Sequence, residues 1–512
     1  MVENDNCTTV AVGKNASASG KVILGHNEDD SRSVVQLHFV PRRTHDAGET
    51  IVFGDGPAVI PQVRETLSYV WSEARTTREN VFFGDSYINE CGVAIVSNSC
   101  EPSKCAPNEK ETCGIGSGLR VIVAQRAHTA REGVIIAASL IEKYGYMSSR
   151  TYEIADAREV WSLQVPTGHR YVCRRIGDDE IYYMPNWFTI HEVDWSDTEH
   201  KNWYFSSDLA SFAEQNGWYE PAKPGVFDDF DFAASYQAPD SSESSAFREK
   251  GGWTVITGKE PEKLRVFSIK APKKYSVSDV KALLRTHYEG TRFDTSEGGK
   301  FNPHTSEDHR SVCCPTTIES SIVEFGEKSS DTKIWRASET PCVSPYVPYR
   351  LCVTGVPQTY QWRDTDEAEA THYAPSADDF RMKPEKYFWL MRSLRYLSDF
   401  DYAGTHEEIY ASVAALEREL DRDLETELEN IEIEHENIET ERENIETKPE
   451  NIEAGGIGTS LEQNIFEAAS KGFERRTRAA EDWAKEIFIR LGDAKVAENR
   501  DRYKRMETKT EG

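Results

Sequence analysis

A cysteine close to the start of the chain, Cys7, is surrounded by residue types that thiol chemistry could use. It stands at the head of the β-rich run TTVAVG, and a second such run, KVILGHN, leads into Asn27, Glu28 and Asp29. The residues between the two runs, KNASASG, favour a turn. This pattern predicts a hairpin with Cys7 at the start of one strand and the polar cluster at the end of the other. The thiol is then either a nucleophile or a packed core residue.

A cysteine nucleophile needs a base and a site that stabilises an oxyanion. The local signature of papain-type enzymes is absent, and none of the 13 histidines has a context that singles it out. Removal of residues 1–6 would give Cys7 a free α-amino group. The pKa of such an amine is about 7.7–8.0 and that of a thiol about 8.5, so the amine could accept the thiol proton at neutral pH. The residue types therefore permit a nucleophile that carries its own base.

The elements that would position Cys7 alternate between strands and helices. Residues 117–146 have a helical pattern, in which Thr129 and Glu132 form a capping-box sequence and Gly145 is a natural stop. Runs rich in β-forming residues follow at 159–165, 169–176 and 180–190. Strand runs that enclose helical segments predict a layered α+β domain.

The order and spacing of longer segments resemble one known family. The stretch from Cys7 to Asp30 resembles the N-terminal signature of the PepD-type cysteine dipeptidases. This family is a branch of the N-terminal-nucleophile (Ntn) hydrolases, related to bile salt hydrolases, penicillin V acylases and secernins. The resemblance covers about residues 7–400 and continues through NECGVAIVSNS, LRVIVAQRAHTAREGV, ADAREVWSLQ, NWFTIHEVD, HYEGTRFD, CPTTIESSIVEF and SPYVPYRLCVTGVP. It implies a four-layer αββα sandwich of the Ntn-hydrolase type with a C-terminal helical extension.

The resemblance also implies roles for residues near the hairpin. Cys7 matches the catalytic N-terminal cysteine, exposed when a short propeptide, residues 1–6, is removed autocatalytically. Asp29 matches the acid that holds the amine and thiol, with a turn-capping carboxylate as the alternative. His26 stands where related acylases carry a cation, often arginine, so it either stabilises charge or packs.

Three further candidates lie far along the chain. Asn186 falls where the superfamily places an asparagine whose amide stabilises the oxyanion, and a strand-end turn residue is the alternative. The second oxyanion donor should come from the backbone near Ser97 and Asn98, with Asn98 as a plain turn residue otherwise. Arg310 resembles the arginine that faces the nucleophile in acylase relatives, and a surface arginine is equally compatible with the sequence.

The activity that the resemblance implies is dipeptide hydrolysis through a thioester on Cys7, with no metal or organic cofactor. Two alternatives remain: an amidase or acylase acting on N-acyl amino acids or related amides, and a secernin-like regulatory protein without peptidase activity. Cys91, Cys100, Cys105 and Cys113 crowd one region, but their spacing fits no zinc pattern, which favours ordinary thiols over a metal site or disulfide.

The composition of the chain limits the classes of molecule that we expect it to bind. The 512-residue chain has a formal charge of −28, which argues against a nucleic-acid binder because such proteins need a concentrated basic face. Neither an apolar stretch of membrane-spanning length nor a secretory signal pattern is present, so we expect a cytosolic protein without membrane contact. Dipeptides are the expected partners, and the sequence leaves open whether the chain forms a homo-oligomer.

The character of the sequence changes near residue 380. We expect an Ntn-hydrolase domain over residues 7–380 and a helical extension over residues 381–512. The extension contains an acidic heptapeptide repeat at residues 425–456, with one fixed apolar position per heptad where a coiled-coil seam needs two. This composition predicts a solvated, mobile or marginally helical insert that takes no part in the chemistry.

Overall fold

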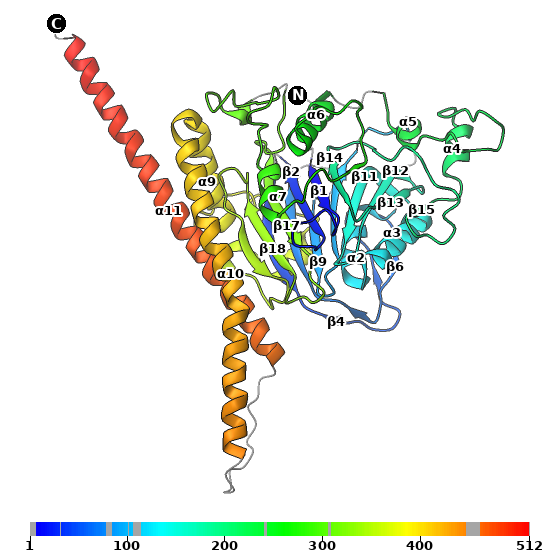
Figure 1. Cartoon of the computed structure of the whole chain (residues 1–512), viewed down its shortest axis with the longest axis horizontal. Helices are drawn as coiled ribbons and strands as arrows, with labels where there is room; N and C mark the ends of the chain where they lie inside the picture. The colour runs from blue at the N-terminus through cyan, green and yellow to red at the C-terminus, as the bar shows by residue number, and fades with distance from the viewer. Residues whose placement is uncertain are drawn as a thin grey trace.

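Two antiparallel sheets packed face to face form the centre of the molecule (Figure 1). The structure is a computed structural model, and it describes residues 7–30, 32–77, 84–100, 102–105, 114–239, 243–305, 309–446 and 461–510. The strands of the first sheet are, in spatial order, β16 (Ser268–Lys270), β14 (Glu180–Met184), β1 (Thr8–Val12), β2 (Ile23–Asp29), β17 (Thr317–Glu324), β18 (Lys333–Ser338) and β19 (Val347–Arg350).

The second sheet lies against the first and contains the longer strands. Its strands are, in spatial order, β15 (Trp203–Phe205), β13 (Val172–Ile176), β12 (Val160–Gly168), β11 (Tyr146–Ala155), β10 (Ala94–Ser99), β9 (Ser86–Asn89), β8 (Tyr69–Thr76) and β3 (Ser33–Val40). Two short ribbons pair β4 (Arg43–Thr44) with β7 (Glu65–Thr66) and β5 (Thr50–Ile51) with β6 (Ile60–Pro61).

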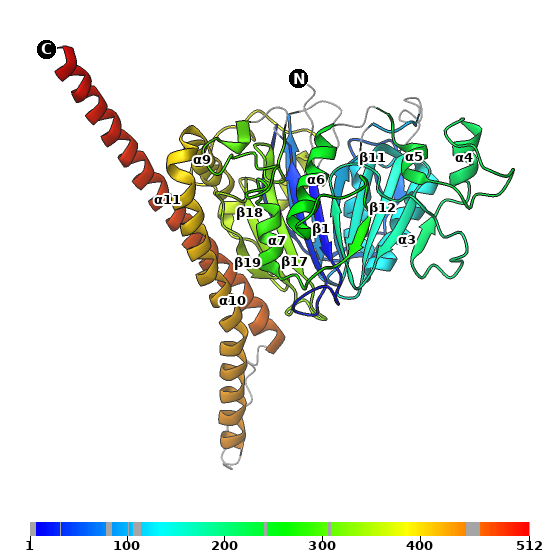
Figure 2. The ribbon, with the colours of Figure 1, turned by 45° about the horizontal axis from the view of Figure 1, so that its top comes forward.

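Helices cover the outer faces of both sheets (Figure 2). On the second sheet, α2 (Leu119–Arg126) and α3 (Ala130–Tyr144) bury apolar side chains such as Ile122 and Val134 in one cluster with Trp161 of β12. On the first sheet, α6 (Glu243–Thr257) and α7 (Val277–Leu284) bury Trp253 and Leu284 in the same way. Apolar residues of both sheets meet between them. The predicted four-layer αββα sandwich is therefore confirmed.

The predicted hairpin is confirmed as β1 and β2. Their register pairs Thr8 with Asn27, at the centre of the first sheet between β14 and β17. The predicted helix start and stop are also confirmed. The Thr129 hydroxyl accepts a hydrogen bond from the Glu132 amide at the start of α3, and Gly145 ends that helix at φ 74°. Glycine adopts this left-handed φ without steric cost.

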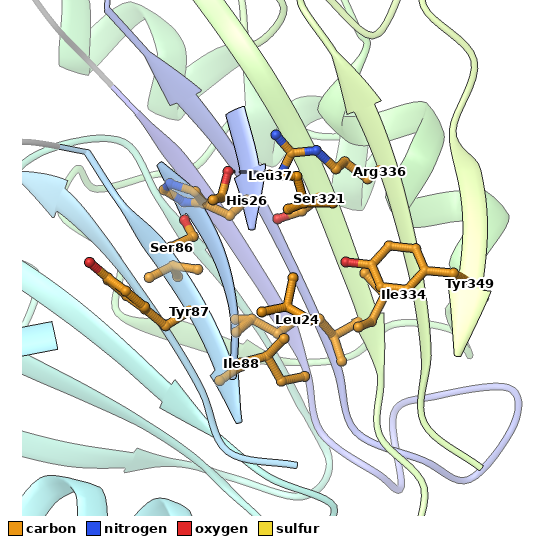
Figure 3. Close-up of a pocket in the computed structure, with 15 residues that line it drawn as sticks. Leu24, His26, Leu37, Ser86, Tyr87, Ile88, Ser321, Ile334, Arg336 and Tyr349 are labelled. Carbon is orange, nitrogen blue, oxygen red and sulfur yellow. Dashed lines mark hydrogen bonds between the residues drawn. The ribbon is translucent and has the colours of Figure 1, made fainter. Parts of the chain in front are cut away.

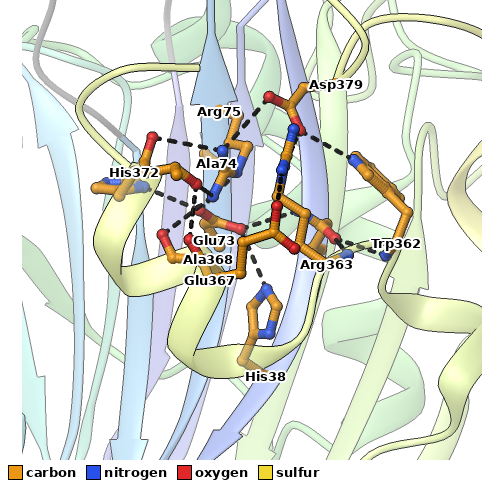
Figure 4. Close-up of polar contacts among 12 residues, drawn as sticks. His38, Glu73, Ala74, Arg75, Trp362, Arg363, Glu367, Ala368, His372 and Asp379 are labelled. Atoms are coloured by element: carbon orange, nitrogen blue, oxygen red, sulfur yellow. Dashed lines mark hydrogen bonds and ion pairs between the residues drawn. The ribbon is translucent and has the colours of Figure 1, made fainter. Parts of the chain in front are cut away.

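Shorter helices connect these layers. They are η1 (Gly116–Gly118), α4 (Leu209–Gln215), α5 (Phe232–Tyr236), η2 (Pro303–Thr305), η3 (Gln358–Tyr360) and α8 (Thr365–Thr371). A buried ionic cluster ties the α8 region to the second sheet (Figure 4). Glu73 on β8 pairs with His38 and His372 at 3.1 Å each, and Arg75 bonds the Thr371 hydroxyl at 2.9 Å. Burying such charges is tolerable only because each has a partner.

Three helices form the C-terminal part: α9 (Tyr387–Phe400), α10 (Tyr402–Glu446) and α11 (Leu461–Thr510). They pack beside β18 and β19 at the edge of the first sheet (Figure 1). Phe473 of α11 stacks on Tyr349 of β19 with ring centroids 4.2 Å apart. The α10 helix includes the first part of the acidic repeat, and residues 447–460 lie outside the described residues. Within the described parts, we find no helix with the length and apolar character needed to cross a membrane.

Candidate active site

Cys7 lies immediately before β1, in the middle of the first sheet. The register of the hairpin places it opposite Glu28, and its thiol donates a hydrogen bond to Glu28 Oε1 at 3.3 Å. Only 3% of Cys7 is exposed. The expected propeptide, residues 1–6, lies outside the described residues. The thiol is thus held at a sheet centre by a carboxylate, a more specific environment than an apolar core.

A chain of hydrogen bonds leads to Glu28, the partner of this thiol. Asn98 donates to the Thr9 hydroxyl at 2.8 Å, and that hydroxyl lies 2.9 Å from His26 Nδ1. His26 Nε2 lies 3.2 Å from Glu28 Oε2. Burial lowers the pKa of His26 to about 4, so the ring is neutral at pH 7. His26, expected either to stabilise charge or to pack, is buried and bonds to Thr9 and Glu28.

The thiol and its partner carboxyl both hold protons more tightly than usual. Burial raises the pKa of Cys7, and Glu28 and Asp29 raise it further. Burial also raises the pKa of Glu28, while the buried guanidinium groups of Arg120 and Arg150 act in the opposite direction. In this form the thiol is protonated at neutral pH and is a weak nucleophile, so it needs a base for reaction.

Asp29 is fully buried and is held by two donors. The Thr317 hydroxyl donates to its Oδ1 at 2.6 Å, and Arg310 donates to its Oδ2 at 3.0 Å. Arg310 also donates to the Thr316 hydroxyl at 2.6 Å and to the Cys314 sulfur at 3.0 Å. The structure thus brings two sequence candidates, Asp29 and Arg310, into one ion pair beside the hairpin.

Asn186 follows β14 with a left-handed φ of 73°. Its side-chain amide donates to the Ser99 carbonyl at 2.9 Å, and its Oδ1 accepts from Arg248 at 2.6 Å. Arg248, buried on α6, also donates to the Cys7 carbonyl at 2.6 Å. A primary amide has two N–H donors, so Asn186 has the capacity to bind a further acceptor.

Asn98, expected beside an oxyanion-donating backbone or as a plain turn residue, lies within strand β10 and not in a turn. Its side-chain amide donates to Thr9 and, at 2.9 Å, to Glu153, while its backbone belongs to the β10 ladder opposite Thr151. Asn98 is therefore linked to Cys7 only indirectly, through Thr9, His26 and Glu28. No role for Glu28 or Arg248 was predicted from the sequence. The register of the hairpin could have indicated Glu28, but no local motif marks Arg248.

One cavity lies between the two sheets (Figure 3). Its lining is largely apolar, with His26 and Arg336 among its polar members. Cys7, Asp29 and Asn186 do not line it, so this cavity is a gap in the sandwich core, separate from these three candidates. The remaining lining residues are Leu24, Leu37, Val70, Ser72, Ser86, Tyr87, Ile88, Ala94, Val96, Ser321, Val323, Ile334 and Tyr349.

Comparisons with known proteins give the following relatives. A "Probable dipeptidase" of Salmonella dublin is 26% identical over 360 residues, covering 67% of this chain and 80% of that protein. "Dipeptidase A" of Lactobacillus helveticus is 23% identical over 421 residues, covering 78% and 83%. A crystal structure of a conjugated bile acid hydrolase variant from Clostridium perfringens aligns with a TM-score of 0.31 and 10% identity, covering 65% of this chain and 89% of that one.

The family comparison covers most of the chain. The model of Peptidase family C69 matches residues 6–414. The match begins beside Cys7 and includes every candidate residue described above. The chain belongs to peptidase family C69.

Proposed function

We propose that this protein is a dipeptidase whose nucleophile is the thiol of Cys7, exposed at a new N-terminus. The observation that carries the proposal is the position of Cys7 at the head of β1, with its thiol on Glu28 and Asp29 paired to Arg310. Membership of the family and the dipeptidase names of the relatives support the choice of substrate.

Maturation is the first step of the proposed chemistry. The Cys7 thiol passes its proton to Glu28 and attacks the carbonyl carbon of Asn6. The Asn6–Cys7 amide bond breaks as the acyl group moves to sulfur, and the departing Cys7 nitrogen takes the proton from Glu28. Water then hydrolyses the thioester. Glu28 suits the first transfer because it lies 3.3 Å from the sulfur and its pKa is raised.

Hydrolysis of a dipeptide uses the amine that maturation creates. The α-amino group of Cys7 takes the thiol proton, and the thiolate attacks the scissile carbonyl. Asn186 donates to the oxyanion with its second N–H, while Arg248 fixes both Asn186 and the Cys7 backbone. The leaving amine accepts a proton, and water releases the first amino acid from the thioester.

Substrate choice is tested by assaying purified protein on a panel of dipeptides and on the matching N-acetyl amino acids. The dipeptidase proposal expects kcat/KM to be at least tenfold higher for dipeptides. Faster hydrolysis of the acylated amino acids would identify an acylase, and no turnover of either class by chain that begins at Cys7 would favour a regulatory protein.

A further inference from the structure

Four buried side chains outside the active site converge on one point. They are His287, after α7, His304 on η2, Cys313 before β17, and Cys342 after β18. One ligand atom from each lies within 4.8 Å of the others. The proposed peptidase chemistry uses none of these four side chains.

The separations of these atoms match those around a tetrahedral zinc ion. His287 Nε2 and His304 Nε2 are 3.3 Å apart, and His304 Nε2 lies 3.6 Å from Cys342 Sγ and 3.9 Å from Cys313 Sγ. Zinc bonds of about 2.0–2.1 Å to nitrogen and about 2.3 Å to sulfur, at tetrahedral angles, give separations of about 3.3 Å between nitrogens and about 3.6 Å between nitrogen and sulfur. The four side chains therefore surround a space of the right size.

The outer nitrogens of both rings face carboxylates. His287 Nδ1 lies 2.9 Å from Glu289 Oε1, and His304 Nδ1 lies 2.7 Å from Asp399 Oδ1. A carboxylate at Nδ1 fixes the proton there, so the lone pair of each Nε2 points into the cluster. Two such lone pairs at 3.3 Å repel each other unless a cation or a proton lies between them. Carboxylate–histidine pairs of this kind are typical of zinc ligands in proteins.

We propose that His287, His304, Cys313 and Cys342 bind one Zn²⁺ ion in a closed, structural Cys2His2 site. Two thiolates with two imidazoles favour zinc over magnesium or calcium, which prefer oxygen ligands. Four protein ligands leave no position for water or substrate, so the ion stabilises the fold and takes no part in hydrolysis.

Such an ion would link two parts of the molecule. Asp399, which orients His304, lies on α9 and also pairs with Arg395 at 2.8 Å. Cys313 adjoins Cys314, whose sulfur accepts from Arg310, the partner of Asp29. The zinc site would therefore hold the C-terminal helices to the segment that positions the active-site ion pair.

Metal content tests the proposal. The full-length wild-type chain, produced with zinc in the medium and purified without a metal-affinity tag, is compared with Cys342→Ser by mass spectrometry of metals. Cys352→Ser is the matched control, since Cys352 is also buried but lies outside the cluster. We expect about one zinc per chain in the wild type and in Cys352→Ser. Cys342→Ser should lose most of the zinc.

A second variant distinguishes loss of the metal site from misfolding of Cys342→Ser. Asp399→Asn keeps all four ligands, and loss of such an outer partner typically weakens metal binding about 10–100-fold. In competition with a zinc indicator, it should release zinc more readily than the wild type. Cobalt substituted for zinc in the wild type should show the strong visible absorption of a tetrahedral thiolate site. A wild-type chain without stoichiometric zinc, or one with a Cys313–Cys342 disulfide, would overturn the proposal.

Discussion

Two buried groups of cysteine and histidine differ in the partners of their ring nitrogens. In the Cys7 group, both nitrogens of His26 belong to a hydrogen-bond chain that runs from Thr9 to Glu28 and ends on a single thiol. In the Cys313 group, each ring gives its Nδ1 to a carboxylate and turns its Nε2 toward two thiols. The first arrangement can move a proton, and the second is suited to holding a cation.

A third buried cluster completes the comparison. Both nitrogens of His372 face carboxylates, Glu73 and Asp85, at 3.1 Å each. Their charges raise the pKa of His372 to about 9, so this ring is an imidazolium at neutral pH. A buried histidine is therefore neutral at His26, metal-binding in our proposal at His287 and His304, and cationic at His372. The partners of the two ring nitrogens differ among these three places.

The largest effect that we predict concerns the proton acceptor of the Cys7 group. Glu28→Gln keeps the shape of the side chain but removes its capacity to accept the thiol proton. General acid–base contributions are typically about 10²–10⁴-fold, so cleavage before Cys7 should slow by that order. The rate is followed by intact mass, with Glu324→Gln on neighbouring β17 as the control. Normal cleavage in Glu28→Gln would remove Glu28 from the mechanism.

Asn186→Ala tests whether the side-chain amide of Asn186 stabilises the oxyanion. Loss of one donor typically costs about 10²–10³-fold in turnover, so kcat should fall far more than KM rises. The assay uses protein whose N-terminus is already Cys7, which separates turnover from maturation. If kcat stays near the wild-type value, Asn186 is a structural residue that ends β14.

The charged His372 gives a pH-dependent contribution to stability. Its folded pKa of about 9 lies above the unfolded value of about 6.5. The contribution of His372 to the free energy of unfolding is on the order of 3 kcal/mol. It is complete below about pH 6.5 and is lost as the pH rises through about 9. Chemical denaturation of wild type and His372→Gln should give free energies of unfolding that converge between pH 6 and 10. A constant difference would mean that His372 is not charged.

The acidic repeat should show the smallest effect. Glu425 and Glu427 pair with Lys333 and Arg476, so these two residues are kept. Replacing residues 429–456 with a short Gly/Ser linker should leave dipeptide hydrolysis and Tm close to wild type, because a solvated acidic segment adds little to the core. A drop in Tm of more than a few degrees would show that the repeat packs on another surface.

The sequence predicted the hairpin, the helix boundaries near Thr129 and Gly145, and the layered fold, because these depend on local patterns. It did not identify Arg248, which reaches Cys7 from a helix 241 residues away. The Cys313 group was also missed. His304 is 17 residues from His287 and 38 from Cys342, and such spacings in irregular segments match no zinc motif. Contacts between distant segments become visible only when the sheets are assembled.

N-terminal sequencing combined with a dipeptide assay tests the central claim most directly. Wild-type protein and Cys7→Ala are purified in parallel, and the fraction of chain that begins at Cys7 is compared with the specific activity. We predict that wild-type activity rises in proportion to the processed fraction, while Cys7→Ala stays unprocessed, folded and inactive. Full activity in chain that still begins at Met1, or normal activity in Cys7→Ala, would contradict the account.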